Sequence, residues 1–135
     1  MRQDVAAARV VMASGVPFVM LPCCGVVSSF TVSRPELEYW LKGKNPLADY
    51  LAENTIRKAE SYASGTPWTR SIWDVTAVAW LLNDENRFML SEIRNIPLPD
   101  YNRHYESTEG PFPMGYVYYI KRDALMTDLF RKITE

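Results

Sequence analysis

The stretch of sequence that says most about the fold is Ile72-Trp73-Asp74-Val75-Thr76-Ala77-Val78-Ala79-Trp80-Leu81-Leu82. Here an irregular segment passes into a helix that is apolar nearly all round, so the helix from Val75 to about Leu82 is predicted to lie inside the protein. The first N–H groups of a helix are unpaired and carry partial positive charge, which makes this junction a natural place for a site. The local alternative is that Asp74 is an N-cap and Trp73 a core aromatic residue.

Size and composition exclude several classes of protein. The chain has 135 residues, of which 47% are hydrophobic, enough for one domain with a real core. A formal charge of −1 and the lack of a basic cluster argue against nucleic acid as a partner. No apolar run approaches the ~20 residues of a membrane span, and the N-terminal residues lack the apolar region that is typical of a signal peptide. The two cysteines, Cys23 and Cys24, are adjacent and form no disulfide framework, so a cytoplasmic location is expected.

The N-terminal half of the sequence predicts three helices and one buried strand. Asp4 caps a helix over Val5 to Ser14, which Gly15 stops. The continuous apolar run Val16 to Pro22 fits a strand that is buried on both faces. Two further helices follow. The capping box Ser33-Arg34-Pro35-Glu36 opens one that runs to about Leu41. Asn45-Pro46 opens another that runs to about Ala63, one face of which is marked by Leu47, Leu51, Thr55, Ala59 and Tyr62 or Ala63.

The C-terminal part reads as strands and a final helix. Strands are predicted at Arg87 to Ile93 and at Met114 to Ile120, with an irregular strand near Tyr101 to Glu106 in the polar connection between them. Asp123 is predicted to cap an amphipathic helix with Leu125, Met126, Leu129, Phe130 and Ile133 inward. The methionines Met12, Met20, Met89, Met114 and Met126 sit among apolar neighbours and are predicted to be core residues.

These elements give an α/β fold with one feature that is wrong for a complete domain. A buried parallel strand such as Phe18 to Leu21 needs neighbours on both sides, and no second strand in the sequence looks alike. Residues 1–135 are therefore interpreted as a single, incomplete domain, a mixed sheet flanked by helices that something else completes.

Two stretches of the sequence form a recognisable pair of motifs. The first is Asp4-Val5-Ala6-Ala7-Ala8-Arg9-Val10-Val11 with Ser14-Gly15-Val16-Pro17, of the form D-x-x-A-A-x-x-V-x-x-S-G-V-P, followed by Met20-Leu21-Pro22. The second is Trp73-Asp74-Val75-Thr76-Ala77-Val78-Ala79, of the form [H/W]-D-x-x-A-V-A. In this order they resemble the C-terminal portion of the inosine-uridine-preferring nucleoside hydrolases. The resemblance implies the C-terminal part of a Rossmann-like nucleoside-hydrolase fold whose N-terminal half is missing.

The family hydrolyses the N-glycosidic bond of ribonucleosides with the help of calcium, which suits a site that must hold a diol and a water together. The resemblance assigns Asp74 to a calcium ligand and Trp73 to the position that contacts the leaving base. The family's acidic cluster, D-x-D-x-x-x-D-D, has no counterpart in this sequence, and its ribose-binding Asn would fall one residue before Met1. No catalytic residue is therefore assigned to this chain.

Two functions remain open at this point. In one, the chain is the C-terminal fragment of a calcium-dependent ribonucleoside hydrolase, inactive alone and completed by its missing half or by self-association. In the other, it is a non-enzymatic remnant that acts as a binding or interaction module. Cys23 and Cys24 are expected to be buried small residues rather than nucleophiles. His104 is expected to be an exposed loop residue.

Overall fold

Five helices and two small sheets form the chain in the computed structural model, which describes residues 4–102, 104–105 and 109–135. The helices are α1 (Val5–Met12), α2 (Arg34–Leu41), α3 (Pro46–Ala63), α4 (Val75–Leu81) and α5 (Arg122–Thr134). The strands are β1 (Val19–Met20), β2 (Thr31–Ser33), β3 (Thr69–Ser71), β4 (Met89–Arg94) and β5 (Met114–Ile120). Two 3₁₀ segments complete them, η1 (Val27–Ser29) and η2 (Asp84–Asn86). The mixed α/β class predicted from the sequence is confirmed.

The first three helices begin where their capping residues predict. The Asp4 carboxylate accepts the Ala7 N–H at 2.8 Å, and the Asn45 side-chain oxygen accepts the Ala48 N–H at 2.8 Å. Such bonds satisfy N–H groups that have no partner within the helix. Of the helices in the described ranges, none has the length and apolar character needed to cross a membrane.

The start of α5 differs from the prediction. Lys121 occupies the N-cap position, and Asp123 lies in the first turn, so the prediction that Asp123 caps this helix is wrong. The Asp123 carboxylate instead accepts a hydrogen bond from the Arg122 guanidinium at 2.7 Å. An acidic residue in the first turn still favours the helix through its dipole.

The larger sheet has the strand order β1-β5-β4. β1 runs parallel to β5, with Val19 opposite Gly115, and β4 runs antiparallel to β5. The expectation that β1 has no parallel neighbour in this chain is therefore wrong, because β5 pairs with one of its two sides. The other side of β1 pairs with no strand in the part of the chain that the structure describes. β1 is also shorter than the predicted run, whose residues Pro17 and Pro22 lack the N–H that a ladder needs.

A second sheet was not predicted. β2 and β3 pair antiparallel, with Thr31 opposite Ser71 and Ser33 opposite Thr69. Just beyond this ladder the Ile72 N–H donates to the Phe30 carbonyl at 2.9 Å. The pairing thus leads the chain directly to Trp73, the first residue of the candidate site.

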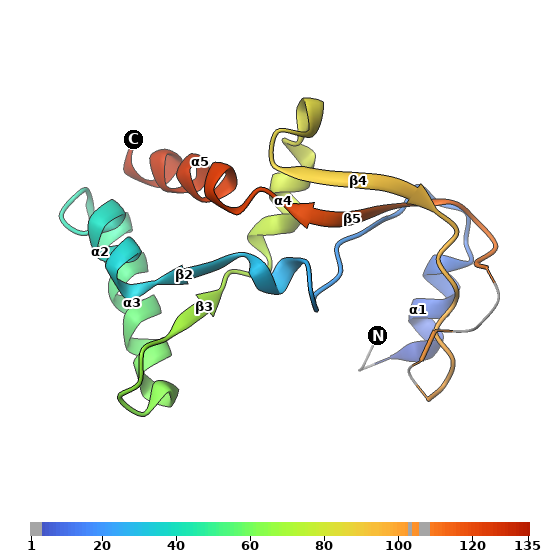
Figure 1. Cartoon of the computed structure of the whole chain (residues 1–135), viewed down its shortest axis with the longest axis horizontal. Helices are drawn as coiled ribbons and strands as arrows, with labels where there is room; N and C mark the ends of the chain where they lie inside the picture. The colour runs from blue at the N-terminus through green and yellow to red at the C-terminus, as the bar shows by residue number, and fades with distance from the viewer. Residues whose placement is uncertain (1–3, 103, 106–108) are drawn as a thin grey trace.

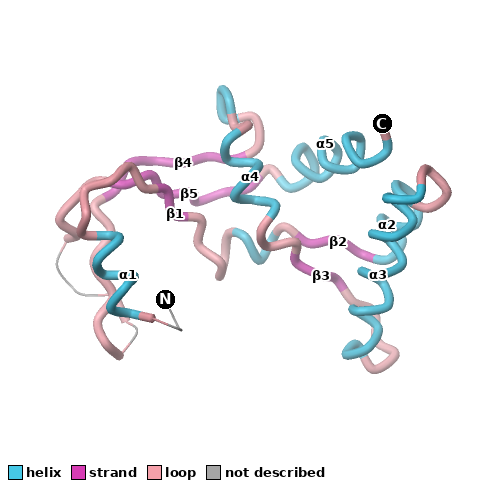
Figure 2. The backbone as a smooth tube through the Cα atoms, turned by 180° about the vertical axis from the view of Figure 1, so that it is seen from behind, coloured by secondary structure: helices cyan, strands magenta, loops and turns pink. Residues whose placement is uncertain are grey.

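The elements are spread along the long axis of the molecule (Figure 1). The helices α2 and α3 and the β2–β3 pair lie at one end, α1 lies at the other, and α4, β4 and β5 lie between them; the view from behind agrees (Figure 2). A larger core joins α2, α3 and α5 around Phe30, Phe88 and Phe130. A smaller core is formed by Met12, Met20, Ile96 and Met114. The predicted burial of all five methionines is confirmed.

Helix α4 contradicts its predicted burial. Val78 is 62% exposed, Leu81 is 78% exposed and Leu82 is 47% exposed, whereas only Thr76 and Ala79 are buried. The exposed three are spaced i, i+3 and i+4 and so share one face of the helix. We call Val78, Leu81 and Leu82 the α4 stripe. On α3 the predicted face is confirmed only in part: Ala59 is buried, but Leu47 is exposed, and Ala48 and Ala52, which lie outside that face, are buried.

The connection between β4 and β5 holds one isolated bridge, between Pro99 and Tyr105. The irregular strand predicted near Tyr101 to Glu106 is thus reduced to a single pairing, and part of that range lies outside the described residues. His104 has a side chain that is 81% exposed, which confirms its prediction as an exposed loop residue.

Candidate functional site

Trp73 and Asp74 lie between β3 and α4, and hydrogen bonds hold the backbone on both sides of them. On one side the Ser71 hydroxyl donates to the Ser28 carbonyl at 3.2 Å. On the other the Thr76 hydroxyl donates to the Trp73 carbonyl at 2.7 Å. The main chain is therefore fixed while both side chains remain exposed.

The structure contradicts the local alternatives, in which Asp74 caps α4 through its side chain and Trp73 is a core aromatic residue. Trp73 is 47% exposed, so it is not a core aromatic residue. Asp74 occupies the N-cap position of α4, but its φ of −78° and ψ of −24° are helical and its side chain makes no capping bond. A capping side chain reaches back to the N–H groups when its own backbone is extended, a condition that Asp74 does not meet. Among the described residues its carboxylate forms no hydrogen bond or ion pair.

Both side chains line a cavity of about 330 Å³. Its walls come from α2, α3, α5 and the segment that joins β3 to α4, and most of them are apolar. The lining residues are Leu37, Leu41, Leu51, Thr55, Arg70, Ser71, Ile72, Trp73, Asp74, Val75, Leu129, Phe130 and Ile133. An apolar cavity with a few polar groups at one side is the usual form of a small-molecule site.

Arg70 contributes a cationic group to the lining of this cavity, and sequence reasoning did not single it out. Its guanidinium donates a hydrogen bond to the Tyr62 hydroxyl and lies 6.0 Å from the centre of the Tyr62 ring. Arg70 belongs to β3, a strand that the sequence pattern did not predict, and it lines the same cavity as Asp74, which follows it four residues later in the chain.

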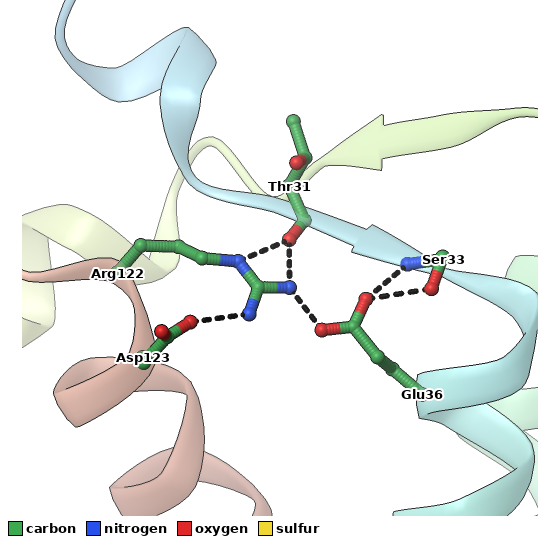
Figure 3. A network of polar contacts seen from close by, with 5 residues as sticks. All are labelled: Thr31, Ser33, Glu36, Arg122 and Asp123. Carbon is green, nitrogen blue, oxygen red and sulfur yellow. Dashed lines mark hydrogen bonds and ion pairs between the residues drawn. The ribbon is translucent and has the colours of Figure 1, made fainter.

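Two of the helices that wall the cavity, α2 and α5, are linked by Arg122 at the start of α5 (Figure 3). Its Nε and Nη2 atoms donate to the Thr31 carbonyl at 3.1 and 2.7 Å, and Nη2 also donates to the Glu36 carboxylate. Glu36 in turn accepts the N–H and the hydroxyl of Ser33 at 2.8 and 2.7 Å. The predicted capping residues of α2 are therefore also the anchor for α5.

This network shifts two pKa values. Partial burial favours the protonated form of Glu36, but hydrogen bonds from Ser33 and Arg122, together with the charge of Arg122, outweigh it and place the pKa of Glu36 below its usual value. Partial burial acts on Arg122 to lower its pKa, but its bonds to Asp123 and Glu36 reverse this and raise the pKa. Both groups are charged at neutral pH.

We expect the network to stabilise the fold at neutral pH and to fail in acid. Because the pKa of Glu36 is lowered in the folded state, its contribution is fully present above its unfolded pKa of about 4.3 and is lost as the pH falls through the folded value. Glu36→Gln should reduce the free energy of unfolding at pH 7 by about 1 kcal/mol, since the bond to a charged partner weakens. Urea melts at pH 7 and pH 3 measure this, and the difference between the two proteins should be smaller at pH 3 than at pH 7. An equal difference at both pH values would contradict it.

This chain alone does not supply enough ligands for the calcium ion that the resemblance implies. Asp74 is one carboxylate, and calcium takes roughly six to eight oxygen ligands. Among residues 4–102, 104–105 and 109–135, no group of three or more His, Cys, Asp or Glu side chains is placed to hold a metal ion. A calcium site containing Asp74 would need ligands from elsewhere.

The other residues singled out in the sequence stand apart from the cavity. Cys23 and Cys24 are both exposed, so their predicted burial is wrong. They follow the apolar run that ends at Pro22 and lie in a turn whose hydrogen bonds are internal, which leaves the thiols at the surface. His104 donates its backbone N–H to the Asp100 carboxylate at 2.8 Å and does not line the cavity.

A scan of the chain against models of protein families finds no match, and a search of curated proteins finds no significant match either.

Proposed function

We propose that this chain supplies the base-binding side of a ribonucleoside hydrolase, an enzyme that cleaves the N-glycosidic bond of a nucleoside to release base and ribose. One observation carries the proposal: the exposed side chains of Trp73 and Asp74, whose backbone is held by hydrogen bonds on both sides, line the same cavity of about 330 Å³. A volume near 300 Å³ is at the small end of ligand sites and suits a flat molecule of one or two rings.

Each of the two residues has a role in this proposal. The Trp73 indole offers a flat apolar face on which a purine base stacks. Asp74 contributes one anionic ligand toward calcium, whose other ligands come from a segment with the acidic cluster that this sequence does not contain. The resemblance of Asp4–Pro17 and Trp73–Ala79 to the nucleoside hydrolases supports the same assignment.

The alternative proposal is a binding module without catalysis. It is favoured by the composition of the cavity, whose walls are mostly apolar and which holds Asp74 as its one carboxylate among the described lining residues. Such a site retains a flat ligand but offers no second carboxylate to take a proton from water. Both proposals share the role of Trp73 and differ in whether a partner segment completes the reaction centre.

Trp73 provides the test that both proposals must pass. The isolated chain should bind a purine nucleoside such as inosine more tightly than uridine, because a purine presents a larger face to the indole. Trp73→Ala should weaken inosine binding by roughly 5- to 100-fold, since stacking of a base on an aromatic side chain contributes about 1–3 kcal/mol. Isothermal titration calorimetry measures both values.

A matched control is Tyr118→Ala, because Tyr118 is an aromatic residue with the same exposed fraction, 47%, that lies on β5 away from the cavity. It should leave inosine binding unchanged. Equal binding by wild type and Trp73→Ala would place the ligand elsewhere. Release of ribose from inosine or p-nitrophenyl riboside by the isolated chain would contradict the view that it needs further groups for catalysis.

We further propose that the chain associates with another polypeptide, either its own copy or a segment that carries the acidic cluster. Two surfaces support this. One is the side of β1 on which no described strand pairs, which is a template for another strand; the other is the α4 stripe, which leaves three large apolar side chains in solvent.

The α4 stripe gives an expected result in solution. The purified chain should form dimers or larger species at micromolar concentration, and Leu81→Glu should shift it toward monomer, because a charge at the contact is desolvated without a partner. Leu47→Glu, on the exposed face of α3, is the matched control and should have no effect. Multi-angle light scattering reports the mass. A monomeric wild-type chain would show that these surfaces do not mediate self-association.

A further inference from the structure

The thiols of Cys23 and Cys24 are adjacent in sequence, free and exposed. They are the two cysteines of the chain, and neither takes part in the candidate site described above. They lie just beyond β1, in the turn that leads to η1.

Hydrogen bonds within this turn satisfy several of its backbone groups, and both thiols stay free and exposed. The Val27 N–H donates to the Pro22 carbonyl at 2.9 Å, and the Ser28 N–H donates to the Cys23 carbonyl at 2.8 Å. The Gly25 N–H donates to the Ser28 hydroxyl at 3.0 Å, and its φ of +83° is one that glycine adopts without strain. The result is a closed turn that presents two sulfur atoms from neighbouring residues.

Sulfur ligands select soft, thiophilic centres over hard cations such as calcium or magnesium. When one sulfur has bound such a centre, the other is held beside it by a single peptide unit, so the second bond forms at a high effective concentration. A monosubstituted arsenic(III) compound needs two sulfurs and no more, because its organic group fills the third position.

We propose that Cys23 and Cys24 form a surface dithiol site that binds one monosubstituted trivalent arsenical through both sulfurs. In water the arsenical carries two hydroxyl groups. Each sulfur displaces one of them: an arsenic–sulfur bond forms, an arsenic–oxygen bond breaks, and the thiol proton leaves with the hydroxyl as water. Arsenic stays trivalent throughout, so the step needs no oxidant or reductant. The site is separate from the Trp73 cavity and does not depend on the proposed hydrolase function.

The experiment titrates the folded chain with phenylarsine oxide and follows two quantities. Intact-mass spectrometry counts the arsenicals bound, and a thiol reagent counts the free sulfurs. One equivalent should remove both free thiols and add one arsenical, and an excess of a monothiol should not displace it, whereas a dithiol should. The variants Cys23→Ser and Cys24→Ser should each bind at least about 100-fold more weakly, because chelation is lost.

A sharper control keeps two exposed thiols but separates them. The double variant Cys24→Ser with Lys58→Cys places the second thiol on the solvent side of α3. It should bind as weakly as the single serine variants and release the arsenical to a monothiol. The proposal is overturned if wild type takes up two arsenicals per chain, or if its affinity equals that of the separated pair. Since all these positions are exposed, thermal melts should confirm that each variant folds.

Discussion

Asp74→Ala should abolish nucleoside hydrolysis in a protein that joins this sequence to a segment with the family's acidic cluster. The proposed role of Asp74 is that of a direct calcium ligand, so the loss should exceed the roughly 10- to 100-fold that follows when a supporting partner of a metal ligand is removed. Dependence of the rate on calcium should be lost with it. Steady-state rates with inosine over a range of calcium concentrations measure both effects.

The structure makes this test sharper, because it removes the main competing explanation. A capping aspartate replaced by alanine costs about 0.5–2 kcal/mol of stability, but Asp74 makes no capping bond. The melting temperature of Asp74→Ala should therefore stay close to wild type while activity falls. Asp84→Ala, which removes another exposed carboxylate just after α4, should keep full activity. A large drop in melting temperature with normal turnover of the folded enzyme would make Asp74 a structural residue.

Phe30→Ala should produce one of the largest losses of stability among single substitutions in the core. Phe30 is 0% exposed and belongs to the larger core, where it supports the strand pair that leads to Trp73. Truncating a buried phenylalanine to alanine costs about 3–5 kcal/mol, a large part of the 5–15 kcal/mol that holds a typical domain together. The melting temperature should fall by roughly 10–20 °C. Thermal unfolding followed by circular dichroism reports the shift.

Tyr39→Ala provides the comparison, because Tyr39 is an aromatic residue that is 77% exposed. Its substitution should change the free energy of unfolding by less than about 1 kcal/mol. If both substitutions had the same small effect, the core would not be centred on Phe30.

The starts of α1, α2 and α3 were predictable because their signals are local. Ser33 and Glu36 stand three residues apart, and Asn45 precedes Pro46, so each pattern contains all the atoms that make its cap. The strand pair β2–β3 could not be predicted in the same way. Its strands are three residues each, and their partners lie far apart in sequence.

The candidate site was likewise predictable only where its signal is local. The junction at Trp73 and Asp74 was visible in the sequence, because a change from irregular to apolar pattern marks it. The cavity beside it was not visible, since α2, α3 and α5 build its walls through tertiary packing. The exposure of α4 escaped prediction for a related reason. An apolar pattern shows that a helix can be buried, but its burial also requires another element that packs over it.

The parallel contact of β1 with β5 also sets an order of events during synthesis. Val19 pairs with Gly115, and Arg122 reaches back to Thr31 over a separation of 91 positions. Ribosomes add about 5–20 residues per second, so β1 waits on the order of 5–20 s before its partner strand has been made. Contacts of such high sequence separation also slow the folding search itself. Through this interval the apolar residues around β1 are available to chaperones, and a codon change that slows translation between β1 and β5 should lengthen that exposure.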